Sequence, residues 1–423
     1  MPLLEELLLQ GHRGPHFGAR ITFQRFPRLR NLALSQTVVP ADVSLFAQLR
    51  VLTLSFCSYD FSFDVFLDIL AASVQLENLT LYGALSYPSD EWLRGDPSTT
   101  SPISIPRLRK LTMENHSIVH TSRFLAHVHL PPTVSLLIIG DYEAELSPLN
   151  AMLPPNRSAT LPILAIATEV AMTVQGDDYR FKLICDAPQP LPVPNQGASA
   201  PSSSRRLDAS RLHAVFALLR SDYDEWDPFM AQGLEDLVES MAMGQPGLGS
   251  PLTQLTVTGV HDHATADAWE RVFRTFPALE VLKISGDPCS HVTDVFRGLH
   301  AASTTRADSQ SQSSVACWDL RHVEVEGLGV VETYAAMEEC FRYRSDKGVV
   351  VKVLDLVNLP DAEGLTLQAR QAFVKDLSRM VECVQVFDDE QESDEQESDE
   401  QESDEQESDG SASNGSESDD SEM

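Results

Sequence analysis

A six-residue phrase, Leu-x-x-Leu-x-Leu with aliphatic substitutes, recurs along this chain of 423 residues and limits its fold more than any other feature. Copies begin at residues 4, 29, 49, 76, 108 and 134, and again at residues 252, 279, 320, 351 and 381. The end of each copy alternates aliphatic and other residues with a period of two, as a β-strand with one buried face does. One such strand cannot bury its apolar edge alone, so successive copies must stack side by side.

This phrase is the core strand of a leucine-rich repeat, and the predicted fold class is therefore α/β. We expect an irregular leucine-rich-repeat solenoid with parallel strands on the concave face and helices on the convex face. The segments between the phrases supply the helices. Residues 267–276 place four apolar side chains on one helical face before Pro277 ends the helix, and residues 65–70 and 292–299 carry similar faces.

The interval between residues 140 and 251 departs from this pattern. Residues 167–172 form a degenerate copy of the phrase, and residues 180–185 form a predicted strand. Residues 187–206 are rich in Pro, Ser and Ala, which indicates an exposed loop or linker. Asp208 is then placed to cap a helix. The predicted apolar face of that helix consists of Leu212, Val215, Phe216 and Leu219.

Four segments follow from these patterns. Residues 1–186 hold the N-terminal repeats, with no visible capping unit, and residues 207–387 hold the C-terminal repeats. Residues 187–206 link them, and residues 388–423 form an acidic tail. A second polar insertion at residues 301–314 predicts a disordered loop.

The tail contains four copies of Glu-Gln-Glu-Ser-Asp between residues 390 and 409. It has no apolar surface to bury, and its like charges repel, so we expect disorder from about residue 388 onward. Serines in such acidic surroundings suit acidophilic kinases, and phosphorylation would add negative charge. The candidate phosphorylation sites are Ser393, Ser398, Ser403, Ser408, Ser416 and Ser418.

The net charge of −32 is concentrated in this tail, which holds 18 of the 63 acidic residues and none of the 31 basic ones. The remainder still carries −14 without a Lys/Arg cluster, which disfavours binding to nucleic acid or to an anionic membrane. The N-terminus lacks the pattern of a secretory signal, and no stretch approaches the ~20 apolar residues that span a bilayer. We therefore expect a cytoplasmic or nuclear protein.

Motifs that carry chemistry are scarce. The six cysteines lie far apart without a C-x-x-C pair and are interpreted as reduced packing thiols. Two His-x-His pairs, His127/His129 and His261/His263, lack further ligands at suitable spacing and are interpreted as solvated loop residues. The sequence contains no nucleotide-binding motif and no nucleophile elbow. We assign no catalytic residue, no cofactor and no metal site, and we expect a protein that is not an enzyme.

The expected concave face can be read from the phrases, because alternate strand residues point to opposite faces. Its first half is small and hydroxylated, whereas its second half carries most of the charge. This gradation suits a protein partner, although solvated strands also tolerate such residues without one. The candidate partner-binding residues are Asn31, Thr53, Asn78, Thr80, Tyr82, Lys110, Thr112, Gln254, Thr256, Lys283, Glu324 and Asp355.

Three repeats begin with an apolar-Pro-x-Leu phrase, at residues 26–29, 105–108 and 276–279. With its irregular repeats and long insertions, the chain resembles over residues 1–387 the C-terminal region of the large fungal families of F-box proteins. In those families an N-terminal F-box recruits a cullin-based ubiquitin ligase and the repeats hold the substrate. The resemblance implies the substrate-recognition repeats of a ligase adaptor. Cullin ligase subunits would be partners if an F-box lay upstream, since this chain contains none.

The sequence also resembles a second class of proteins. A leucine-rich array followed by a long acidic tail resembles the acidic nuclear phosphoproteins that bind histones. Those proteins have short, regular units, whereas the repeats here are long and uneven. Under this alternative the tail would bind basic partners such as histones.

Overall fold

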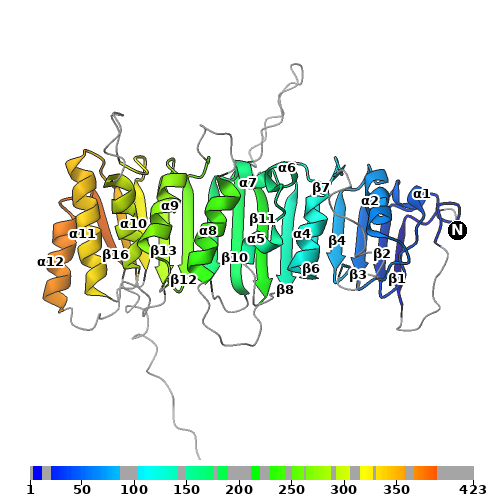
Figure 1. Ribbon diagram of the computed structural model, residues 1–423, viewed down its shortest axis with the longest axis horizontal. Coiled ribbons are helices and arrows are strands. Elements are labelled where there is room, and N and C mark those ends of the chain that lie inside the picture. Colours follow the sequence, from blue (N-terminus) through cyan, green and yellow to red (C-terminus); the bar gives the residue numbers. More distant parts are fainter. Residues whose placement is uncertain are drawn as a thin grey trace, which may run out of the picture. The chain divides into compact units, whose positions relative to one another are not determined.

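The aliphatic phrases form the strands of one large sheet in the computed structural model (Figure 1). The structure describes residues 3–11, 21–85, 102–141, 148–174, 179–188, 211–219, 229–242, 250–261, 263–286, 292–304, 315–326, 330–357 and 366–387. Contacts divide the chain into two units, residues 1–387 and residues 388–423. The predicted tail with its six candidate phosphorylation sites, and residues 189–206 of the predicted linker, lie outside the described residues.

The phrases form strands because their last four residues and the residue that follows alternate between a buried and a half-exposed side chain, as in β2 and β3. The strands are β1 (Glu6–Gln10), β2 (Asn31–Ser35), β3 (Val51–Ser55), β4 (Asn78–Tyr82), β5 (Ile103–Ser104), β6 (Lys110–Ser117), β7 (Val128–His129), β8 (Ser135–Asp141), β9 (Glu169–Val174), β10 (Tyr179–Pro188), β11 (Arg211–Leu219), β12 (Gln254–Gly259), β13 (Val281–Gly286), β14 (His322–Glu326), β15 (Val353–Val357) and β16 (Cys383–Phe387).

Helices occupy the segments between strands, and several begin at a hydroxyl side chain. Ser62, Thr265 and Thr366 each accept a hydrogen bond from the backbone N–H three residues later, which satisfies a free donor of the first turn. The helices are α1 (Val43–Phe46), α2 (Phe63–Ala72), α4 (Ile118–Ala126), α5 (Pro148–Met152), α6 (Arg157–Thr160), α7 (Ile163–Ile166), α8 (Phe229–Met241), α9 (Ala266–Thr275), α10 (Thr293–Thr304), α11 (Val331–Asp346) and α12 (Leu367–Leu377).

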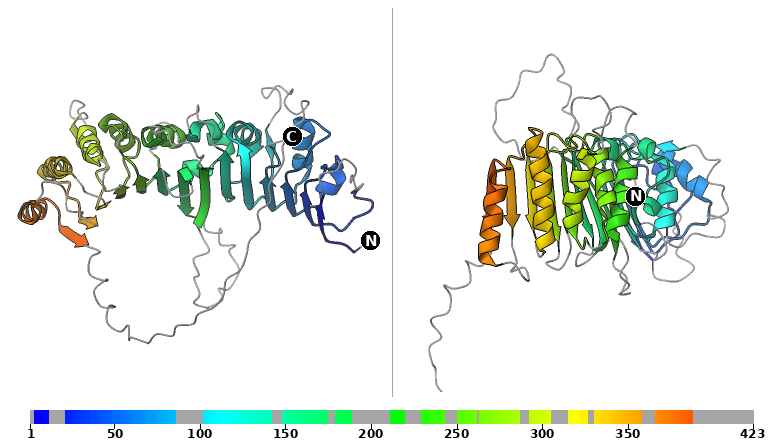
Figure 2. Two further views of the ribbon diagram at one scale, coloured as in Figure 1. Left: turned by 90° about the horizontal axis from the view of Figure 1, so that it is seen from below. Right: turned by 60° about the vertical axis from the view of Figure 1, so that its left-hand side comes forward.

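The described strands of the main sheet lie in the order β1-β2-β3-β4-β6-β8-β11-β10-β9-β12-β13-β14-β15-β16. Every neighbouring pair is parallel except the two that include β10, which runs antiparallel to β9 and β11. The helices gather on one face of this sheet (Figure 2). The α/β class with a mostly parallel sheet is thus confirmed.

The strand register keeps one row of apolar side chains under the helices from the first strand of the sheet to the last. It passes through Leu9, Leu34, Leu54, Leu81, Met113, Ile138, Phe216, Leu183, Met172, Val257, Ile284, Val325, Leu356 and Val386. Twelve of these side chains, from Leu34 to Leu356, are buried, and only those on the two edge strands are partly open. A slip by one residue would expose a whole strand's apolar set, so this row fixes the register.

The middle of the sheet differs from the predicted repeats. The degenerate copy and the predicted strand become β9 and β10, but the predicted helix after Asp208 is wrong, because residues 211–219 form strand β11. Ala214, Phe216 and Leu218 are buried, as Val215 and Ala217 are, so apolar residues line both faces of this strand. A segment that is apolar throughout is compatible with the periodicity of a helix and with that of a strand. Hydrogen bonding with β8 and β10 stabilises this segment as a strand.

Two further expectations need correction. Residues 301–304 of the predicted disordered loop continue helix α10, and residues 305–314 lie outside the described part of the chain. Cys383, expected to be a packing thiol, is exposed on edge strand β16, whereas Cys57, Cys185, Cys317 and Cys340 are buried. Cys383 is in register with Val353, on the face of the sheet opposite the helices, and it lies on the last strand of the sheet.

Candidate functional site: the open face of the sheet

The face of the sheet opposite the helices, here called the open face, is formed by strands that are far apart in the sequence (Figure 2). It carries the strand residues that alternate with the buried row. In β2, β3, β12 and β13 these side chains are half-exposed. The open face is therefore the part of the sheet whose side chains are available for binding.

A single row crosses the middle of this face, and we call it the central row. In register order it consists of Leu8, Ala33, Thr53, Thr80, Thr112, Leu137, Val215, Ile184, Ala171, Thr256, Lys283, Glu324, Asp355 and Gln385. The row changes in character from hydroxyl side chains, through aliphatic ones, to charged ones. Different sections of this surface would thus contact polar, apolar and charged groups of a partner.

The structure brings together many of the residues expected on the concave face. Seven of them lie in the central row, namely Thr53, Thr80, Thr112, Thr256, Lys283, Glu324 and Asp355. Asn31, Asn78, Lys110 and Gln254 lie in the row at the start of the strands, and Tyr82 lies in the row at their end. Thr112 is only 7% exposed, so it offers little contact area.

The sequence patterns did not predict an aliphatic section in the centre of the open face. Leu137, Val215, Ile184 and Ala171 are consecutive members of the central row. Two of them belong to β10 and β11, for which no face was assigned because the phrase is degraded there. The period-two pattern of residues 181–186 was the signal that could have identified Ile184.

Charged groups pair at the C-terminal end of the central row. Lys283 Nζ lies 2.5 Å from Glu324 Oε2, and Glu324 is the in-register neighbour of Asp355. His322 Nε2 lies 2.8 Å from Asp355 Oδ2. Ser285 donates a 2.6 Å hydrogen bond to Glu326 in the adjacent row. These contacts pre-order the acidic end of the face, because each charge has a partner on a neighbouring strand.

The two His-x-His pairs singled out in the sequence do not form metal sites among the described residues. His261 is not a solvated loop residue, since it is 1% exposed, stacks on Trp269 and lies 3.2 Å from the carbonyl oxygen of Ser285. His127 is likewise buried, with Nδ1 at 2.8 Å from the carbonyl oxygen of Arg123. Both rings act as packing groups with backbone partners.

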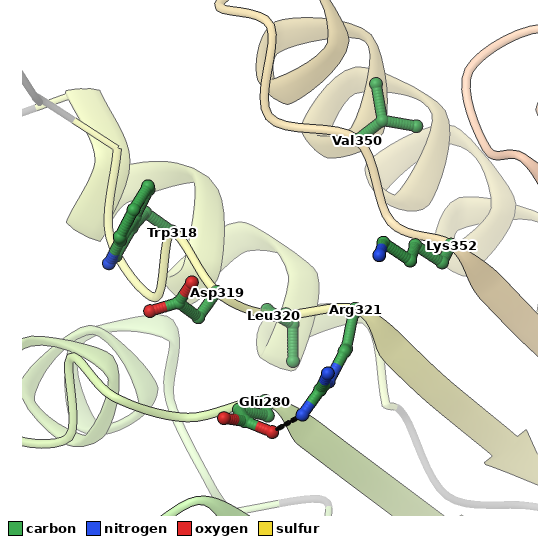
Figure 3. Close-up of a pocket in the computed structure, with 7 residues that line it drawn as sticks. All are labelled: Glu280, Trp318, Asp319, Leu320, Arg321, Val350 and Lys352. Carbon is green, nitrogen blue, oxygen red and sulfur yellow. Dashed lines mark hydrogen bonds and ion pairs between the residues drawn. The ribbon is translucent and has the colours of Figure 1, made fainter.

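A small pocket of about 190 Å³ lies at the beginning of strands β13, β14 and β15 (Figure 3). Its walls are Glu280, Trp318, Asp319, Leu320, Arg321, Val350 and Lys352. The Arg321 guanidinium is paired with the Glu280 carboxylate, and the Trp318 side chain is 62% exposed. The lining thus combines an exposed aromatic side chain with charged groups of both signs.

No family model, no curated protein and no solved structure matches the chain. No described helix combines the length and the apolar character needed to cross a lipid bilayer. Conclusions about function therefore depend on the open face and on the sequence patterns.

Proposed function

We propose that the chain is a leucine-rich-repeat solenoid that binds a protein partner on its open face and performs no catalysis. The observation that carries this proposal is the central row, which places hydroxyl, aliphatic and charged side chains on one face of the sheet, where all of them except Thr112 and Val215 are partly or fully exposed. Protein interfaces combine an apolar centre with a polar surround in the same way. In solenoids, the face lined by strands is the usual binding surface.

The resemblance to fungal F-box proteins extends this proposal to a specific role. In that role residues 1–387 are the substrate-recognition repeats of a ubiquitin-ligase adaptor. The substrate protein would lie along the central row, with its apolar residues on Leu137, Ile184 and Ala171, which are partly exposed. Basic residues of the substrate would face Glu324 and Asp355, since Lys283 neutralises only part of that charge.

The proposal is tested by affinity capture of the full chain with and without a substitution in the central row. Thr256→Arg adds a long charged side chain next to the aliphatic section, and Thr275→Arg makes the same change on helix α9. We expect at least one partner protein to be lost with Thr256→Arg and retained with Thr275→Arg. If both variants capture the same proteins, the open face is not the binding surface.

The ligase role needs a separate measurement, since the repeats and the ligase would bind different segments. Sequencing of the 5′ end of the transcript shows whether an F-box is encoded upstream. If it is, the protein expressed with that segment should recover cullin ligase subunits with either variant. Recovery of no ligase subunit would leave the binding role of the open face but reject the adaptor role.

A second role is favoured by the acidic tail, which has 18 acidic residues and no basic one. Such a segment attracts basic proteins through long-range electrostatics. In this role the chain binds histone-like partners in the nucleus through residues 388–423. Capture with a chain that ends at Phe387 distinguishes the two roles, because basic partners should then disappear while a partner of the open face remains.

A further inference from the structure

Three side chains with metal-ligating atoms converge on the open face at β14 and β15. His322 and Glu324 are two residues apart on β14, so both point to this face, and Asp355 is the neighbour of Glu324 on β15. One ligand atom from each lies within 4.8 Å of the other two. In the part of the chain that the structure describes, this is the one group of three such side chains that comes together.

The spacing of these atoms suits a small cation. Donors bound at about 2.0–2.1 Å around a tetrahedral Zn²⁺ lie roughly 3.3 Å from one another. His322 Nε2 and Asp355 Oδ2 are 2.8 Å apart, and no separation in the group exceeds 4.8 Å. Small side-chain rotations would therefore bring all three donors to bonding distance without a movement of the strands.

The Asp355 carboxylate has an unsatisfied oxygen at this position. Its side chain is 15% exposed, and the Oδ1 atom is buried and makes no hydrogen bond. A buried acceptor without a donor carries a free-energy penalty, and native structures rarely leave one unexplained. A cation bound through both carboxylate oxygens would satisfy Oδ1 together with Oδ2.

We propose that His322, Glu324 and Asp355 bind a divalent first-row transition metal ion such as Zn²⁺. One imidazole nitrogen and two carboxylate oxygens are ligands that Zn²⁺ and its neighbours in the series accept. The three side chains are 15–32% exposed, so a fourth coordination position faces the open side of the sheet and can take water. The site does not depend on any protein partner, so it can be tested separately from the proposed function.

Lys283 gives the proposal a specific consequence. Its ammonium group lies 2.5 Å from Glu324 Oε2 and thereby competes with a metal ion for the same carboxylate. Removing this charge makes the group more negative and releases Glu324. A metal site therefore predicts that loss of Lys283 increases metal affinity, whereas a simple ion-pair cluster predicts no metal-dependent effect.

The test measures Zn²⁺ affinity of the full chain by competition with a chromophoric chelator, and visible absorption after addition of Co²⁺. We expect His322→Gln and Asp355→Asn to lower Zn²⁺ affinity at least about tenfold and to abolish the Co²⁺ absorption of the site. Lys283→Met should raise the affinity severalfold. Weak binding of metal ions by the acidic tail is the same in all variants, so it does not affect the difference in affinity between them.

His213→Gln is the matched control. His213 Nδ1 also lies 2.8 Å from an aspartate, Asp186, on the same face, but no third ligand among the described residues converges on that pair. This variant should keep wild-type Zn²⁺ affinity. Equal affinity in the wild type, His322→Gln and Asp355→Asn would overturn the proposal. Circular dichroism of each variant verifies the fold, because unfolding would expose the buried cysteines, which also bind Zn²⁺.

Discussion

Asn150 and Asp236 are 86 residues apart, yet the Asn150 side-chain amide donates a 2.6 Å hydrogen bond to Asp236 Oδ1. The other carboxylate oxygen accepts hydrogen bonds from the backbone N–H groups of Leu149 and Asn150, at 2.9 and 3.2 Å. Asp236 thus satisfies free donors at the start of α5 from its position on α8. These contacts join two helices over the irregular middle of the sheet, where the repeat pattern alone does not specify the packing.

Replacement of Asp236 by Ala should therefore destabilise residues 1–387 strongly. Asp236 is fully buried, and its loss removes the acceptor of two backbone N–H groups and one acceptor from the side-chain amides of Asn150 and Gln232. We expect the free energy of unfolding to fall by about 3 kcal/mol in a denaturant titration. Glu239→Ala is the control, because Glu239 accepts from the same amide at 2.8 Å in an exposed position and should cost at most ~0.5 kcal/mol. Equal losses would contradict this account.

The regular strands were predictable because each phrase contains its own burial pattern. Leu79 and Leu81, for example, alternate with Asn78 and Thr80, and the same alternation in β3 fixes the register between the two strands. Helix α9 was predictable for a similar reason, since its apolar residues recur at helical spacing and Pro277 follows it. Local periodicity is sufficient where one face of an element is buried and the other is solvated.

The middle of the sheet was not predictable in this way. Residues 214–218 of β11 are apolar on both faces, so the sequence does not separate a strand from a helix.

The cluster of His322, Glu324 and Asp355 was not predicted from the sequence, for a different reason. Its members come from two phrases 31 residues apart, and only the register of β14 with β15 places them together. Spacing along the chain could not reveal a site that depends on pairing between strands.

His116 makes stability depend on pH. The ring is buried, Nδ1 accepts a 3.2 Å hydrogen bond from the Leu85 N–H, and Nε2 lies 3.1 Å from the carbonyl oxygen of Leu81. Burial lowers the pKa of His116 from 6.5 to about 4. Between these values the unfolded chain binds a proton that the folded chain does not. The contribution of His116 is therefore complete above pH 6.5 and falls as the pH is lowered toward 4.

We expect this group to lower the free energy of unfolding by about 2 kcal/mol between pH 7 and pH 5. Denaturant titrations of the wild type and of His116→Asn at both pH values isolate the effect, because all other titrating groups are shared. The difference between the two proteins should shrink at pH 5. A pH-independent difference for His116→Asn would refute the prediction.

The thiols should differ in reactivity. Burial raises the pKa of Cys185, Cys317 and Cys340 to about 12, so their thiolates are scarce at neutral pH. Cys383 is exposed on β16. Since the thiolate is the nucleophile, iodoacetamide at pH 7.5 should label Cys383 in the folded protein and leave these three unmodified. Mass spectrometry of peptides from native and urea-unfolded protein measures this, and rapid native labelling of Cys185 would show that the hairpin strand β10 opens.

Edge strand β16 should promote self-association once the acidic tail is removed. It pairs with β15 on one side and with no other described strand, and its Val386 and Phe387 side chains are 41% and 48% exposed. An open apolar edge is a template for pairing with a second chain. In the full chain, Phe387 is followed by residues 388–423, which include 18 acidic residues. Two such segments brought together repel each other at low salt.

Sedimentation velocity over a range of concentrations should therefore show a chain ending at Phe387 associating at concentrations where the full chain is monomeric. High salt should shift the full chain in the same direction, because it screens the tail. Val386→Lys in the truncated chain places a charge on the edge and should restore the monomer. If the truncated chain remains monomeric, the geometry of the edge rather than the charge of the tail protects β16, and the tail is left with partner binding as its role.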